Sequence, residues 1–142
     1  MKIRRMKLTA VLVLVIVLLV GMLALGAEPF KAKLGLFDRL VCLSLLPPEG
    51  SFATLKIVRE LQMELAPTEE ESKLAGLQDD PTSGGVQAVL GWDKVELKEI
   101  LFGEIGKAII VTALEKLNEA EKLQQQHFLL YEMFVVGIKE GE

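Results

Sequence analysis

The residue types that carry most nucleophilic and metal chemistry are scarce in this chain. Cys42 is the only cysteine and His127 is the only histidine. A zinc site takes about three or four protein ligands and is usually rich in cysteine when it is structural, so these two residues do not supply one. Cys42 lies in an apolar run, where burial raises the pKa of a thiol and lowers its reactivity. We therefore expect a buried structural cysteine, no metal site and no cofactor.

His127 has the spacing of a core residue. It follows Leu123 by four positions and shares a face of the expected last helix with Leu130, Phe134 and Ile138. A general base needs a nucleophile within hydrogen-bond reach, and no serine or cysteine stands beside it in the sequence. The pattern favours a hydrogen-bonded core or half-buried histidine over a catalytic one.

Two further stretches resemble ligand-binding loops only in part. Gly103-Glu104-Ile105-Gly106-Lys107 ends like a phosphate loop but lacks the first glycine spacing and the Ser or Thr that would hold magnesium. It predicts a turn from a strand into a helix. Asp79-Asp80 lacks the spacing of an EF-hand loop. We therefore expect no catalytic residues, no cofactor site and no small-molecule substrate.

The acidic helix and loop from Thr68 to Gly85 are the candidate partner surface, in preference to the face around His127. Thr68-Glu69-Glu70-Glu71 is a capping box, and acids in a first helical turn are stabilised by the helix dipole. Few core residues lie in this segment, so its carboxylates are available either to a basic protein partner or simply to solvent. The candidate residues are Glu69, Glu70, Glu71, Asp79 and Asp80.

The elements that must position these residues are mainly helices. Residues 37–46 fit a short helix, with a buried strand as the alternative, and Pro47-Pro48-Glu49-Gly50 ends it. Ser51 is a suitable N-cap for a helix that runs to Leu65. The predicted core stripe of that helix is Phe52, Leu55, Val58, Leu61 and Leu65.

The second half of the domain predicts one hairpin between helices. A short helix from Thr68 closes at Gly76, and residues 78–85 read as a loop. Alternation over 86–92 and 95–102 predicts a β-hairpin with a turn near Asp93-Lys94. Residues 108–114 suggest a helix buried on most sides, before the last helix with His127. The expected fold is α+β and mostly helical, with about five helices packed around one β-hairpin.

A hydrophobic run from Leu8 to Ala27 precedes this domain. About 20 apolar residues are long enough to cross a bilayer as a helix. The expected organisation is a signal-anchor or signal peptide over 1–27, a short tether over 28–33 and a single small domain over 34–142. Four cations before the run favour a cytoplasmic N-terminus and a domain outside the cytoplasmic membrane.

The sequence leaves three fates open for the run. Its length favours retention as an anchor, whereas Ala24-Leu25-Gly26 also permits cleavage and secretion after Gly26. The third possibility is that the run is an annotation artefact, upstream sequence joined to a cytoplasmic protein. The single cysteine fits this possibility equally well.

Charge argues against nucleic acid as a partner. Residues 1–27 hold four of the 16 basic residues and none of the 20 acidic ones, so a net charge of −8 remains on the rest. Three helices followed by a hairpin is the element order of a winged helix. Its recognition helix would begin at Glu69-Glu70-Glu71, which phosphates repel.

Four stretches carry a resemblance to a known family. They are DRLVCLSLLPPEGSFATLKIVREL at 38–61, TEEE at 68–71, Trp92 and LQQQHFLLYEMF at 123–134. Together they resemble a family of small uncharacterised domains met in phage and prophage sequences, over nearly all of residues 34–136. The resemblance implies no site residues. The chain departs from the family in having the hydrophobic leader and in carrying Gln124 where members have a capping Thr.

These observations predict a non-enzymatic accessory or protein-interaction module, membrane-anchored through Leu8 to Ala27 or exported, with an unknown protein partner. The alternative is a cytoplasmic phage-type regulatory or inhibitor protein that binds another protein.

Overall fold

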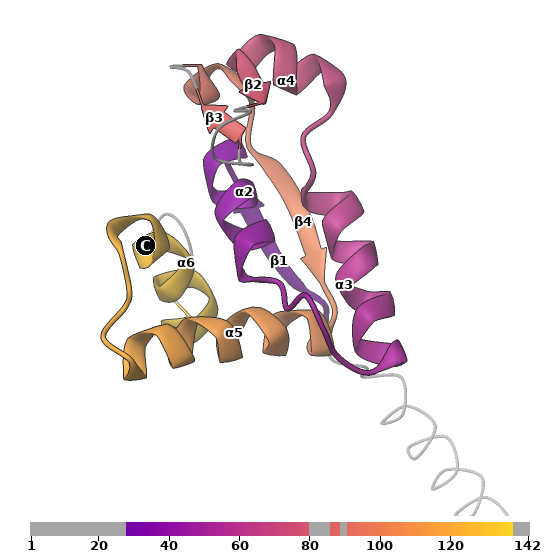
Figure 1. Ribbon diagram of the computed structural model, residues 1–142, viewed down its shortest axis with the longest axis vertical. Helices are drawn as coiled ribbons and strands as arrows, with labels where there is room; N and C mark the ends of the chain where they lie inside the picture. The colour runs from indigo at the N-terminus through magenta and orange to yellow at the C-terminus, as the bar shows by residue number, and fades with distance from the viewer. Residues whose placement is uncertain (1–27, 80–85, 89–90, 138–142) are drawn as a thin grey trace, which may run out of the picture.

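The computed structural model describes residues 28–79, 86–88 and 91–137. Over these residues the chain is mostly helical with small antiparallel sheets of two strands each, which confirms the expected α+β class (Figure 1). The expected leader helix in residues 1–27 lies outside them. None of the helices in the described part is both long and apolar enough to cross a bilayer.

Strands β1 (Phe30–Leu34) and β4 (Lys98–Phe102) form the larger sheet. They run antiparallel, with Phe30 opposite Phe102 and Leu34 opposite Lys98. Alternate residues of each strand are fully buried, as expected for a sheet with one covered face. The buried residues are Ala32, Leu34, Ile100 and Phe102.

The predicted hairpin of residues 86–92 and 95–102 is wrong. Strand β3 (Val86–Ala88) pairs with β2 (Leu77–Asp79), and Trp92–Lys94 form a short 3-10 helix, η1. β4 pairs instead with β1. Alternating polarity indicates that a segment is a strand, but it does not identify the partner strand, which is far away in the sequence here. The loop predicted over 78–85 begins inside β2, and residues 80–85 lie outside the described part.

The tether predicted over residues 28–33 is also wrong, because most of it is β1. Lys31 and Lys33 give the segment its polar character, and both project from the exposed face of the strand. A strand with one buried face alternates in this way, so its polar half resembles a linker. Residues 30–33 therefore belong to the folded part of the chain, before the predicted domain start at Leu34.

Helices α2 (Leu36–Leu45) and α3 (Phe52–Leu65) confirm two predicted helices and pack against each other. The backbone N–H of Thr54 donates to Ser51 Oγ at 3.2 Å, so Ser51 is the N-cap that the sequence predicts.

The apolar stripe of α3 is buried only along its second half. Val58, Leu61 and Leu65 are core residues as predicted, but Phe52 is 87% exposed and Leu55 is 38% exposed. Helical spacing identifies the face that turns inward, but it does not show where the packing partners of that face end. The first turn of α3 extends to one end of the domain (Figure 1).

Helix α4 (Glu69–Ala75) has the predicted capping box at its start. The N–H of Glu71 donates to Thr68 Oγ1 at 3.1 Å, and the N–H of Thr68 donates to Glu71 Oε2 at 2.9 Å. Gly76 ends the helix in the left-handed region with φ of 67°, where glycine is favoured. This element agrees with its sequence prediction at both ends.

Helix α5 (Glu104–Glu119) follows β4 directly, which confirms the predicted strand-to-helix turn at 103–107. The expectation that residues 108–114 are buried on most sides is wrong, because α5 lies at one end of the domain and covers the core with one face (Figure 1). A Cβ on Gly106 would lie 3.3 Å from Leu61 Cδ1, so glycine permits the close approach of α3. The fully buried face is Gly106, Ile110 and Leu114.

The last helical segment is divided into three pieces. They are the 3-10 turn η2 (Gln125–His127), α6 (Phe128–Tyr131) and the π-helical turn η3 (Glu132–Val136). The predicted face is confirmed for His127, Leu130 and Phe134, whereas Leu123 precedes the first helical turn and Ile138 lies outside the described residues. The buried members are His127, Leu130 and Phe134.

An aromatic cluster joins this last segment to the sheet. The ring of Phe134 lies 4.9 Å from the rings of both Phe30 and Phe102, measured between centroids. The ammonium of Lys107 lies 4.4 Å from the centroid of the Phe30 ring. The first residue of β1 is therefore fixed by packing from β4, α5 and η3.

Candidate functional site

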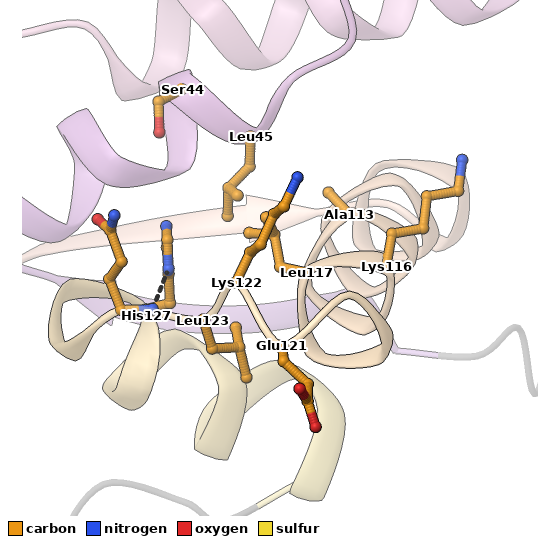
Figure 2. Close-up of a pocket in the computed structure, with 10 residues that line it drawn as sticks. Ser44, Leu45, Ala113, Lys116, Leu117, Glu121, Lys122, Leu123 and His127 are labelled. Atoms are coloured by element: carbon orange, nitrogen blue, oxygen red, sulfur yellow. Dashed lines mark hydrogen bonds between the residues drawn. The ribbon is translucent and has the colours of Figure 1, made fainter.

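An open hollow lies between the end of α2, the second half of α5 and residues 121–127, with a volume of about 740 Å³ (Figure 2). Two of its sides come from helices that also build the core. Its apolar lining is Leu45, Ala113, Leu117 and Leu123.

The chain reverses after α5 to complete this hollow. Glu121 adopts φ of 55°, which is uncommon for a residue other than glycine. The N–H of Lys122 donates to the carbonyl of Leu117 at 2.8 Å, and this bond closes the turn. The reversal brings residues 121–127 back across α5 toward α2.

His127 is 6% exposed and stands in the hollow with its ring directed toward α2 (Figure 2). Its Nδ1 accepts the backbone N–H of Gln124 at 3.0 Å. The neutral imidazole therefore carries its proton on Nε2, where it is a hydrogen-bond donor. The prediction of a hydrogen-bonded, largely buried histidine is confirmed.

Ser44 also lines the hollow, but its hydroxyl donates to the carbonyl of Val41 at 2.6 Å. In that tautomer Nδ1 is occupied by the N–H of Gln124 and Nε2 bears the proton, so neither nitrogen accepts a hydrogen bond from Ser44. The two residues are thus not arranged as a nucleophile and its base.

The remaining polar groups make the hollow rich in donors. Lys116, Lys122 and Glu121 also line the hollow, and Figure 2 shows the Lys122 side chain rising toward Leu45 while the Glu121 carboxylate is directed away from His127. With the Nε2–H of His127, these cations suit an acidic side chain or another anion, while the leucine and alanine lining suits an adjoining apolar group. The arrangement supports binding.

The acidic candidates behave differently from one another. Glu69 pairs with Lys73 across one helical turn at 2.8 Å, and Glu70 is exposed. Glu71 is turned inward, where its Oε1 accepts a hydrogen bond of 2.6 Å from Arg39 Nη2. The backbone of Asp79 belongs to β2, whereas its side chain and all of Asp80 lie outside the described part.

Arg39 is a buried charge that the sequence analysis missed. Its side chain is fully buried, and its Nε and Nη1 have no hydrogen-bond partner among the described residues. Burial raises the pKa of Glu71, but hydrogen bonds from Arg39 and Thr68 and the charge of Arg39 outweigh this and lower it. The available signal was position, because Arg39 lies on the face of α2 that Leu36 and Cys42 also occupy.

Cys42 is buried, as predicted. Burial, with a smaller contribution from the Asp38 carboxylate, raises the pKa of its thiol to about 12. Within residues 28–79, 86–88 and 91–137, no cluster of three or more His, Cys, Asp or Glu side chains could hold a metal ion.

Comparisons of the chain with known protein families, curated proteins and solved structures find no significant match. The resemblance to the phage-type family therefore stays a prediction.

Proposed function

We propose that this chain is a non-enzymatic interaction module, anchored in the membrane or exported through its hydrophobic run, that binds another protein. The hollow beside His127 is the binding face. The observation that carries this proposal is its combination of two lysines and the donor Nε2–H with an apolar lining. Such a surface complements a partner segment in which an acidic residue lies next to an apolar one.

The hollow is a better binding face than the acidic segment because Glu71 is already committed. It contacts both Arg39 and Thr68, and Glu69 contacts Lys73. An incoming basic partner would have to compete with these bonds. Lys116 and Lys122 of the hollow form no ion pair with a carboxylate among the described residues.

The membrane part of the proposal is supported by the four leading cations and the spanning length of Leu8 to Ala27. Alkaline phosphatase and a fluorescent protein, each fused after Glu142, test the topology. We expect phosphatase activity without fluorescence. Fluorescence without phosphatase activity would place the domain inside the cell and favour the cytoplasmic regulatory alternative.

Site-specific crosslinking in the native host tests the binding face. A photo-reactive amino acid at position 124 should give a defined adduct, and the change Lys122→Glu should weaken it. Lys56→Glu is the matched control, because Lys56 is an exposed lysine on α3, outside the lining of the hollow, and it should leave the adduct unchanged. An adduct formed from position 70 and not from 124 would return the partner surface to α4.

A further inference from the structure

Three large apolar side chains are exposed near the start of β1. Phe52 begins α3 and is 87% exposed, Leu101 lies in β4 and is 54% exposed, and Ile105 lies in the first turn of α5 and is 58% exposed. We call this set the basal corner. Other apolar side chains are as exposed, among them Leu74, Leu97 and Phe128, so the inference rests on the position of this group beside the hydrophobic run and not on exposure alone.

A shared hollow joins Leu101 and Ile105, and Phe52 begins α3 at the same end of the domain (Figure 1). Ile105 lines one hollow with Pro47 and another with Ile57 and Leu101. Phe52 lines neither hollow and stands five residues from each of Pro47 and Ile57 in the sequence. The first turns of α3 and α5 lie at the end of the domain where β1 begins and β4 finishes, opposite α4 (Figure 1).

The connection to the hydrophobic run is short. Only Glu28 and Pro29 separate Ala27 from Phe30. Three extended residues reach at most about 11 Å, so Phe30 cannot lie farther than that from the end of the run. Phe30 itself is fixed by its ring contacts with Phe102 and Phe134.

We infer that the basal corner rests in the bilayer interface at the end of the span, with α4 directed away from the membrane. The inference rests on the membrane anchoring in the proposed function. The short connection to the hydrophobic run places this corner next to the lipid surface. Apolar side chains at that depth are transferred from water into the boundary between the headgroups and the acyl chains, which is favourable.

Charge has little part in this contact. Glu60, Glu64 and Glu104 line the hollow that Leu101 and Ile105 share, and Lys107 lies beside the Phe30 ring, so the corner carries no excess of cations. The contact should therefore form on zwitterionic lipid as well as on anionic lipid, because no excess of cations is present to favour the latter.

Depth quenching tests the inference in the full chain, reconstituted in vesicles of phosphatidylcholine with brominated acyl chains. A thiol-reactive fluorophore is attached in the separate variants Phe52→Cys, Ile105→Cys and Leu74→Cys. Leu74 in α4 is the matched control, because it is 53% exposed and lies at the opposite end of the domain. Cys42 can stay in place, since it is buried.

We expect the bromolipids to quench the probes at positions 52 and 105 at least twofold and to leave the probe at position 74 unchanged. Flotation of the same vesicles distinguishes a failure of the membrane anchor from a failure of the proposed orientation. Protein that does not float overturns the anchor and the orientation together. Protein that floats with equal quenching at all three positions, or with none, overturns the orientation alone.

Discussion

A buried charge is the main feature at the scale of single residues. Arg39 is fully buried and pairs at 2.6 Å with Glu71, which closes the capping box of α4 with its other oxygen. One carboxylate thereby holds α4 to α2 and caps α4 at the same time. The capping box predicted from the sequence therefore also stabilises the packing of α4 against α2.

Replacing one partner of this ion pair should destabilise the domain more than replacing both partners. Glu71→Gln removes the carboxylate that pairs with the buried guanidinium of Arg39, and we expect a loss of up to about 3 kcal/mol in the free energy of unfolding, the low end for buried pairs because Glu71 is partly exposed. The double variant Arg39→Met with Glu71→Gln should recover most of the loss, since no buried charge remains. Urea unfolding of residues 28–142 measures both. Glu70→Gln is the control and should change little.

The same carboxylate should make stability depend on pH. The folded-state pKa of Glu71 lies below its ordinary value of 4.5, so the unfolded chain binds the proton more tightly. The stabilisation is fully present above about pH 4.5 and is lost as the pH falls through the folded pKa. Urea midpoints should therefore fall with acid in this window. Glu71→Gln should flatten that fall, and an unchanged slope would contradict the assignment.

At the scale of elements, caps and helix spans were predictable because their signals are local. Ser51, the Thr68–Glu71 box and Gly76 bound α3 and α4 where the sequence places them. Burial was less predictable. The periodicity of α3 includes Phe52 and Leu55, which lie beyond its packing partners and are exposed.

The two halves of α3 should therefore respond differently to truncation. Leu61→Ala removes a buried side chain and should cost about 2 to 5 kcal/mol in the free energy of unfolding, from lost transfer energy and the cavity left behind. Phe52→Ala should cost less than about 0.5 kcal/mol without lipid, because its ring is already in water. Urea melts of both variants decide the matter. Equal losses would show that the first turn of α3 is packed in solution.

At the scale of the whole molecule, the pairing of β1 with β4 was the feature that sequence reasoning missed. The hairpin prediction joined neighbouring segments because alternation indicates strands but not partners. The candidate hollow was missed for a related reason. Its lining residues come from α2, α5 and residues 121–127, and only the tertiary fold brings Ser44, Lys116 and His127 together.

The domain boundary gives the sharpest test of this architecture. A fragment of residues 34–142 lacks nearly all of β1, which leaves β4 unpaired and uncovers Ile100 and Phe102. We expect it to show no cooperative urea transition, whereas residues 28–142 should unfold in one step. Ala32→Lys in the longer fragment is the milder version, since it places a charge at a fully buried position of β1 and should lower the midpoint strongly. Lys33→Ala, on the exposed face of the same strand, is its control and should leave the midpoint nearly unchanged. If residues 34–142 unfolded with the same midpoint as 28–142, the strand would be dispensable, and the fixed connection between the hydrophobic run and the basal corner would lose its basis.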